Sequence, residues 1–321
     1  MKKIIAASLF LLTACTTVQI RAVESTPLPT IPPRVLPTST IEIIIPTESP
    51  TTEALPTNAV SPTPEFTNQR TSSVDGMPQV YIPAGIFHMG GMDVRRAPNE
   101  IPDHDVKLDA YWIDQLEVTN AMFALCMRSG GCTPPQSFKS QRRADYFDNP
   151  EFKDYPVVYV TWGQAKAYCE WAGRRLPTEA QWERAARGDD FRTFPWGEDK
   201  ADGTLVNFNM IVGDTSRVGT YSAGASPFGV LDMAGNVAEW VNDFYTFDYS
   251  VSRNVVNPTG PETSSNFIRV VRGGSLGDAE INIRLSKRSS VQGPNPNAAT
   301  GSSAALGDFS PRIGFRCAED D

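Results

Sequence analysis

Two carboxylates on either side of a Gly-Asn turn are the first candidates for chemistry in this chain. Asp232 and Glu239 bracket Gly235 and Asn236, so backbone carbonyls of the turn can point toward one centre between two acidic side chains. Hard oxygen ligands of this kind suit Ca²⁺. The segment predicts a calcium site; the alternative is an ordinary capped turn that enters a strand.

Histidine and cysteine are too scarce for several other kinds of site. The chain has two histidines, His88 and His104, which argues against a metal centre built from several histidines and against a histidine-based acid/base pair. It has five cysteines, and none of them lies between Cys169 and Cys317. Thiolate chemistry therefore has no residue to use in that stretch.

The bulk composition fits one large globular domain with additional segments. The chain has 321 residues, of which 40% are hydrophobic and 21% are charged, and its formal net charge is −8 at pH 7. Because nucleic-acid binders need basic patches to displace counterions, this balance argues against a nucleic-acid partner.

The first residues predict export. Met1–Lys3 is basic, and Ile4–Leu12 is an apolar run too short to span a bilayer as a mature helix. The run ends in Leu12-Thr13-Ala14-Cys15, which resembles a bacterial lipobox. We therefore expect residues 1–14 to be a signal peptide and Cys15 to carry lipid, since several acyl chains give stable membrane anchoring. This predicts a bacterial lipoprotein on the outer face of the cell membrane or on the cell surface; the alternative is an ordinary signal peptide with a fortuitous cysteine.

Residues 15–75 are predicted to form the lipidated cysteine and a disordered tether. The segment is rich in Pro, Ser and Thr and has a single aromatic residue, Phe66. It cannot bury enough apolar surface to offset the entropy lost on ordering. Its many Pro-Thr and Thr-Pro steps favour extended polyproline II.

Residues 76–321 are predicted to be the folded domain, of class α+β with few regular elements. Short strand-like runs broken by Pro and Gly open it, between Val80 and Gly90. Three helices are predicted by their N-caps: residues 120–128 after Thr119, a helix after Thr161, and residues 179–187 after Thr178. Export also favours two disulfides among the four cysteines of this domain, with three pairings open; buried free thiols are the alternative.

Four ordered stretches of the domain carry a family resemblance. They are Ile82–Gly90 with Tyr111–Asn120, then Tyr168–Glu183, then Ser226–Trp240, and finally Arg272–Ser275 with Gly314–Cys317. Together they resemble the formylglycine-generating enzyme, or sulfatase-modifying factor, family over essentially all of residues 76–321. The resemblance implies a fold related to C-type lectins, with bound calcium.

The resemblance also implies particular ligands and one disulfide. It gives the calcium site through the Asp232 side chain, the Gly235 and Val237 carbonyls and the Glu239 carboxylate. Asn207 and the Phe208 carbonyl match part of a second calcium site, for which Asp214 is the candidate aspartate. Cys169 and Cys317 match a family disulfide, which leaves Cys126 and Cys132 to each other.

The resemblance breaks at the catalytic cysteines of the family. Those two positions fall on Asp278 and Ile283. Soft sulfur ligands select Cu(I), whereas aspartate is a hard ligand and isoleucine is no ligand. We therefore expect neither bound copper nor formylglycine production by the family mechanism.

Three functions are compatible with these residues. The first is a non-catalytic module that binds a peptide, a glycan or a cell-envelope partner in a groove near Asp278, Arg284 and Arg288, with residues 289–310 as its lip. The alternative for the two arginines is salt bridging at the rim of the core. The second function is an enzyme of the formylglycine-generating oxidoreductase family that uses other residues. The third is a structural component of a surface assembly.

Overall fold

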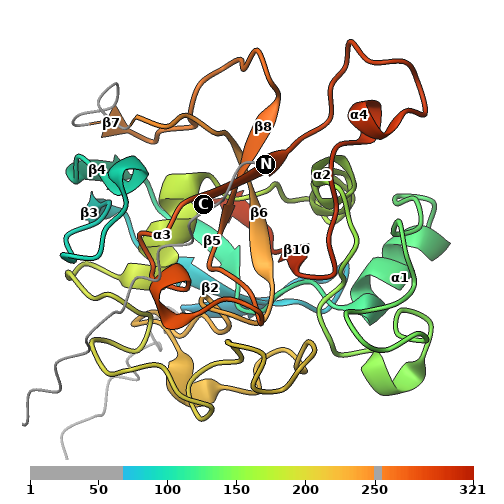
Figure 1. Cartoon of the computed structure of the whole chain (residues 1–321), viewed down its shortest axis with the longest axis horizontal. Coiled ribbons are helices and arrows are strands. Elements are labelled where there is room, and N and C mark those ends of the chain that lie inside the picture. The colour runs from blue at the N-terminus through green and yellow to red at the C-terminus, as the bar shows by residue number, and fades with distance from the viewer. Residues whose placement is uncertain (1–67, 249–254) are drawn as a thin grey trace, which may run out of the picture. The chain divides into compact units, whose positions relative to one another are not determined.

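The computed structural model describes residues 68–248 and 255–321 (Figure 1). The predicted signal peptide, Cys15 and the tether up to residue 67 lie outside the described residues. Within the described ranges, no helix combines the length and the apolar character that a membrane crossing requires.

Three small sheets organise the domain. The first has the order β1-β2-β5-β11, the second β10-β6-β8-β9 and the third β3-β4-β7. Their strands are β1 (Gln69–Thr71), β2 (Pro78–Ile82), β3 (Gly85–Met89), β4 (His104–Leu108), β5 (Tyr111–Asp114), β6 (Ala238–Phe244), β7 (Val255–Val256), β8 (Ile268–Arg272), β9 (Ser289–Gln292), β10 (Ile313–Phe315) and β11 (Ala318–Asp320). Strand β11 pairs with β5 and β1 pairs with β2, so both ends of the described chain belong to one sheet.

The helices begin where the capping residues predict. They are α1 (Asn120–Arg128), α2 (Trp162–Trp171), α3 (Glu179–Arg187) and the short α4 (Ser303–Leu306), with 3-10 turns at Pro98–Glu100, Pro150–Phe152, Ser222–Gly224 and Glu280–Asn282. Thr161 with Gln164 and Thr178 with Gln181 form complete capping boxes, in which the threonine accepts a backbone N–H and the glutamine bonds back to the cap. The three predicted helices are confirmed, as is the mixed α+β character.

The folded domain starts earlier than the predicted boundary at Gly76. Strand β1 lies inside the segment that composition assigns to the tether, and it pairs with β2 through Gln69–Val80 and Thr71–Pro78. Asp75 is an ion-pair partner of Arg174 and accepts a hydrogen bond from the Tyr168 hydroxyl, 2.7 Å away. Composition fails here because strand β1 is ordered by pairing with β2 and Asp75 by contacts with Arg174 and Tyr168, and not by local apolar content.

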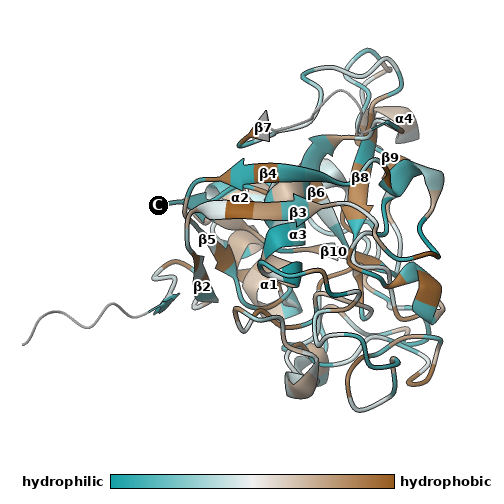
Figure 2. Ribbon diagram, turned by 90° about the vertical axis from the view of Figure 1, so that its left-hand side faces the viewer, coloured by the Kyte–Doolittle hydropathy of each residue, from teal (hydrophilic) through white to brown (hydrophobic). Residues whose placement is uncertain are grey.

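Helix α3 is buried within the domain, although its sequence is hydrophilic. Figure 2 colours much of α3 as hydrophilic, yet all nine of its residues are buried. It contacts β3, β6 and β8, while α2 contacts β6 and α1 (Figure 1). Trp182 contributes to one apolar cluster, and Trp240 to a second cluster around the Cys169–Cys317 pair. The charged side chains of α3 must therefore be neutralised inside the protein.

Candidate functional site

The two positions onto which the resemblance maps the cysteine pair are held by local structure. The Asp278 carboxylate accepts hydrogen bonds from the Ser275 backbone N–H and hydroxyl, at 2.8 and 2.7 Å. The Ile283 side chain is fully buried in a small apolar cluster with Phe194, Val206 and Ala234. Asp278 therefore closes a turn and Ile283 fills a core, and neither supplies a thiolate.

Arg284 and Arg288 are both buried in two-pronged ion pairs. Arg284 donates to both carboxylate oxygens of Glu100 at 2.8 Å. Arg288 donates to both oxygens of Glu179, at 2.7 and 2.9 Å. The geometry is that of the salt-bridging alternative raised for these residues. Glu100 has no distinctive local motif, and only the tertiary structure identifies it as the partner of Arg284.

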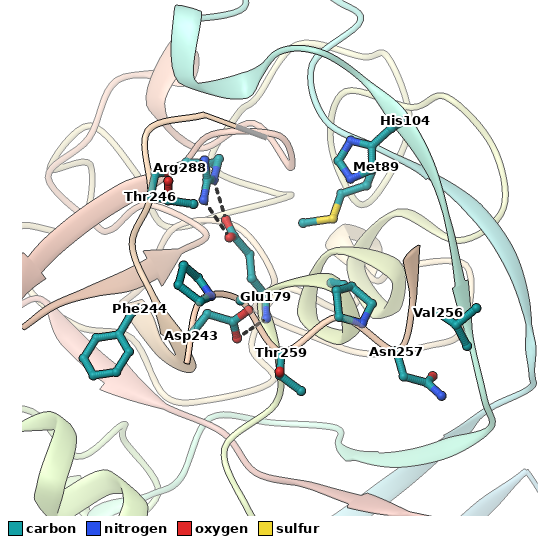
Figure 3. A pocket seen from close by; sticks show the side chains of 14 residues that line it. Met89, His104, Glu179, Asp243, Phe244, Thr246, Val256, Asn257, Thr259 and Arg288 are labelled. Carbon is teal, nitrogen blue, oxygen red and sulfur yellow. Dashed lines mark hydrogen bonds and ion pairs between the residues drawn. The ribbon is translucent and has the colours of Figure 1, made fainter. Parts of the chain in front are cut away.

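Arg288 also lines a cavity of about 400 Å³ beside the N-terminus of α3 (Figure 3). The lining comes from the end of β3, the start of β4, the first residues of α3, the end of β6 and the segment 256–261. Neither Asp278 nor Arg284 is among its lining residues. The structure thus places the three proposed groove residues in different surroundings.

Asp243 is a buried acid in this cavity that the motif analysis did not identify. Its side chain accepts a hydrogen bond from the Glu179 backbone N–H at 2.8 Å, at the first turn of α3. Burial, and then the neighbouring charge of Glu179, raise the pKa of Asp243 to about 7. An acid that ionises near neutral pH and lines a cavity is a candidate binding group.

The residues of the proposed calcium site belong to a buried acidic cluster. Burial raises the pKa of Asp232 to about 6. Burial first, then the charges of Asp232 and Glu239, raise the pKa of Glu117 well above its usual range. One guanidinium, that of Arg316, pairs with Glu239 at 2.7 Å. When Asp232, Glu117 and Glu239 are all ionised, the one positive charge of Arg316 leaves two negative charges uncompensated. A divalent cation would neutralise these two charges.

The geometry of the same cluster is less favourable to a metal than its charge. Both oxygens of Glu239 already accept hydrogen bonds, from Arg316 and from the Trp182 indole. One oxygen of Asp232 accepts from the Gly219 backbone N–H at 2.6 Å. Across residues 68–248 and 255–321, no group of three or more His, Cys, Asp or Glu side chains is arranged to hold a metal ion. Calcium at this site remains a prediction that depends on backbone carbonyls as well as on Asp232.

The second predicted calcium position contains an orphaned polar atom. The Oδ1 atom of Asn207 is buried and has no hydrogen-bond partner, while its Nδ2 donates to the Asp214 carbonyl at 2.9 Å. The Asp214 carboxylate is turned toward the Ser140 hydroxyl and the Arg142 backbone N–H. A buried oxygen without a partner could act as a cation ligand. The Asp214 carboxylate, however, already accepts hydrogen bonds from Ser140 and Arg142.

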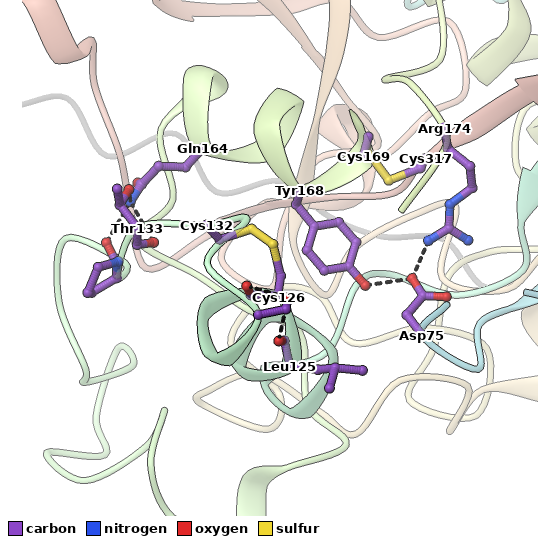
Figure 4. The surroundings of a disulfide bond; sticks show 12 residues. Asp75, Leu125, Cys126, Cys132, Thr133, Gln164, Tyr168, Cys169, Arg174 and Cys317 are labelled. Carbon is purple, nitrogen blue, oxygen red and sulfur yellow. Dashed lines mark hydrogen bonds and ion pairs between the residues drawn. A yellow bond between two sulfur atoms is a disulfide. The ribbon is translucent and has the colours of Figure 1, made fainter. Parts of the chain in front are cut away.

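Both disulfides have the predicted pairing (Figure 4). Cys169 in α2 bonds to Cys317, which lies just before β11, across 148 residues. Cys126 in α1 bonds to Cys132 across 6 residues. All four cysteines of the domain are therefore used in cross-links.

Comparisons with known proteins identify the class. Residues 63–321 match the family model described as "Sulfatase-modifying factor enzyme 1-like domain", and the chain belongs to this family. The chain is 32% identical over 294 residues to the formylglycine-generating enzyme of Streptomyces coelicolor, which covers 75% of this chain and 89% of that protein. It is 34% identical over 254 residues to the serine/threonine-protein kinase pkn1 of Chlamydia pneumoniae, but this match spans only 38% of the kinase.

The solved structures give the same result for the fold. PvdO from Pseudomonas aeruginosa superposes with a TM-score of 0.62 at 28% identity, covering 79% of this chain and 98% of that one. The fold is the formylglycine-generating-enzyme-like α+β fold expected from the motifs, consistent with a relation to C-type lectins.

Proposed function

We propose that this protein is a surface-tethered binding module of the sulfatase-modifying factor family, without the oxidase activity that the family name suggests. The single observation that carries the proposal is the absence of a free cysteine in the domain. All four of its cysteines are cross-linked, and the mapped catalytic positions hold a turn-forming Asp278 and a buried Ile283. A copper-thiolate oxidase needs free thiolates to hold Cu(I).

The same proposal includes a location at the membrane surface and a structural metal ion. Lipid on Cys15 would anchor the chain to the membrane, and the Pro/Thr-rich segment would let the domain reach a peptide, a glycan or a protein of the cell envelope. Calcium at Asp232, Gly235, Val237 and Glu239 would offset the excess charge of the acidic cluster. Its role would be to hold the loops together, because the domain has few regular elements.

An oxidoreductase is the second candidate, and the observation that favours it is the similarity to the Streptomyces enzyme over 89% of that protein's length. This candidate needs a redox centre made from residues other than cysteine. A structural role in a surface assembly is compatible with the same features as the binding module and differs in the size of the partner.

The deciding experiment is an oxidation assay on the purified protein. The protein is supplied with Cu(I), oxygen and a cysteine-bearing sulfatase peptide, and loss of mass at the peptide cysteine is recorded. The Streptomyces coelicolor enzyme, run in parallel, validates the assay. We expect no conversion by a folded protein; conversion at a rate comparable to that of the control enzyme would refute the proposal.

A further inference from the structure

Two acidic residues, Glu179 and Asp243, and several apolar residues line the cavity beside α3 (Figure 3). The walls are provided mainly by Met89, Phe244, Val256, Pro258 and Pro261. A volume of about 400 Å³ lies within the range of sites that bind small organic molecules. The hydrocarbon part of a ligand would be buried against these walls.

The positive group in the lining is already committed to protein partners. Two nitrogens of Arg288 donate hydrogen bonds to the carboxylate of Glu179. A third nitrogen donates to the backbone carbonyls of Asn99 and Thr246, at 3.1 and 2.9 Å. This arginine is therefore poorly placed to attract a ligand carboxylate or phosphate.

Asp243, in contrast, has one carboxylate oxygen that lacks a hydrogen-bond partner among the residues that the structure describes. The side chain is only 4% exposed, and one oxygen, Oδ2, accepts the Glu179 backbone N–H. The other oxygen, Oδ1, accepts no hydrogen bond from the residues that the structure describes, and Asp243 is among the residues that line the cavity. A carboxylate oxygen held in a largely buried place without a partner is costly unless a cation or a donor meets it.

Gly260 lets the chain pass close to this carboxylate. A Cβ atom on Gly260 would lie 2.9 Å from Asp243 Oδ1. Any side chain at this position would therefore press on the oxygen. With glycine there, the segment 256–261 can line the cavity beside Asp243 without a side chain pressing on Oδ1.

We propose that this cavity binds an organic ammonium ion, with Asp243 Oδ1 as its counter-ion and the apolar walls around its hydrocarbon body. The ammonium group provides both the charge and the hydrogen-bond donor that Oδ1 lacks. Two sources share this chemistry, a free small amine and the lysine side chain of a protein. The inference deepens the proposed function, on which it rests, by naming the class of ligand.

The charged groups around Asp243 set how this binding depends on pH. They are Glu179 on α3, Arg288 before β9, and Arg269 on β8, whose guanidinium stacks on the Phe244 ring at 3.4 Å. His104 on β4 is a titratable residue of the same cavity lining. Because Asp243 is partly protonated near neutral pH, an ammonium ion that binds there displaces its proton. The affinity should rise as the pH increases from 6 to 8.

Calorimetry on the full chain tests the proposal with three probes. Benzylammonium represents the free amine, Nα-acetyl-lysine methylamide represents the lysine side chain, and benzyl alcohol is the uncharged control. We expect one of the two ammonium probes to bind at least tenfold more tightly than benzyl alcohol, and which of them binds identifies the source. If neither binds better than benzyl alcohol, the proposal is overturned.

Two variants locate the site. Asp243→Asn keeps an acceptor for the Glu179 N–H but removes the charge, so we expect at least a tenfold loss of affinity. Asp154→Asn removes a carboxylate that pairs with Arg217 at 3.3 Å outside this cavity, and its affinity should stay within twofold of the unaltered protein. Equal binding by Asp243→Asn and the unaltered protein would contradict the assignment.

A measurement on the unaltered protein gives an independent answer. Titrating the ammonium probe at pH 7 in two buffers of different ionisation enthalpy reports the protons released on binding. We expect a release of about half a proton, because the pKa of Asp243 lies near that pH; no release would oppose Asp243 as the counter-ion. The oxidation assay decides the proposed function by a different readout, so the two can fail separately.

Discussion

Arg316 and Glu239 form a two-pronged ion pair in the interior of the domain. The arginine Nε lies 2.7 Å from Oε2 and its Nη2 lies 2.7 Å from Oε1, and the two residues are 0% and 1% exposed. Arg316 also donates to the backbone carbonyls of Asp114, Gln115 and Leu231. The pair therefore ties the Gly-Asn turn motif of the middle of the chain to the Gly-Phe-Arg-Cys motif near its end.

Removing Glu239 should destabilise the protein strongly. Glu239→Ala leaves the Arg316 guanidinium buried without its counter-ion, which typically costs about 3–5 kcal/mol. Chemical denaturation would show this as a lower free energy of unfolding. Lys166→Ala, which removes an exposed ion pair with Glu170, should change stability by less than about 1 kcal/mol. A similarly small effect for Glu239→Ala would contradict the structural role of the pair.

Calcium is better tested at Asp232, because Glu239 has this second role. With millimolar Ca²⁺ present we expect the chelator EGTA to lower the melting temperature by at least about 5 °C, since a ligand at a hundred times its Kd adds about 2.7 kcal/mol. Asp232→Asn should lose most of this response. A melting temperature that does not respond to chelator in the unaltered protein would eliminate the calcium site.

The titration of Asp243 predicts an unusual pH dependence of stability. Its folded pKa is raised to about 7 from an ordinary value of 3.8. A raised folded pKa means that its favourable contribution is complete below the unfolded value and is lost as the pH rises through the folded value. Asp243→Asn should thus be more stable than the unaltered protein at pH 8, by up to about 4 kcal/mol.

Comparison of the two proteins across pH isolates this group. Asp232, Asp114 and Glu117, whose pKa values burial also raises, are present in both proteins and cancel in the difference. The stability advantage of Asp243→Asn should disappear near pH 4. An advantage that stays constant from pH 4 to pH 8 would show that the effect does not come from the ionisation of Asp243.

The two disulfides should differ in their contribution to stability. Cys169–Cys317 closes 148 residues and Cys126–Cys132 closes 6. The chain-entropy relation gives about 5 kcal/mol for the long loop and about 2 kcal/mol for the short one. Paired Cys→Ser variants, compared by denaturant unfolding, should reproduce this order. The reverse order would mean that native-state effects outweigh loop closure.

Lipidation of Cys15 can be tested without any assumption about the domain. Cys15→Ser should move the protein from the membrane fraction to the soluble fraction of expressing cells and abolish incorporation of labelled palmitate. Thr16→Ser is the matched control and should leave both unchanged. Membrane retention and labelling of Cys15→Ser would contradict the anchor.

The local chemistry of the sequence predicted much of the framework. Thr119, Thr161 and Thr178 mark the starts of α1, α2 and α3, because an N-cap satisfies backbone donors within three residues. The ordered motifs predicted the family and, through it, both disulfides. The boundary at Gly76 was placed too late, because strand β1 pairs with the neighbouring strand β2 and Asp75 pairs with Arg174.

The sequence by itself determined the absence of cysteine between Cys169 and Cys317, and with it the lack of thiolates at the mapped catalytic positions. Only the tertiary structure decided which charges meet. Glu100 and Arg284 are 184 residues apart, and Asp243 and Glu179 are 64 apart. Such pairings leave no periodic or local signal, since they arise when separate elements pack and the buried charges must find partners. The surroundings of Asp243 could not be predicted for the same reason. They are assembled from α3, β6 and the segment 256–261, which come together only on folding.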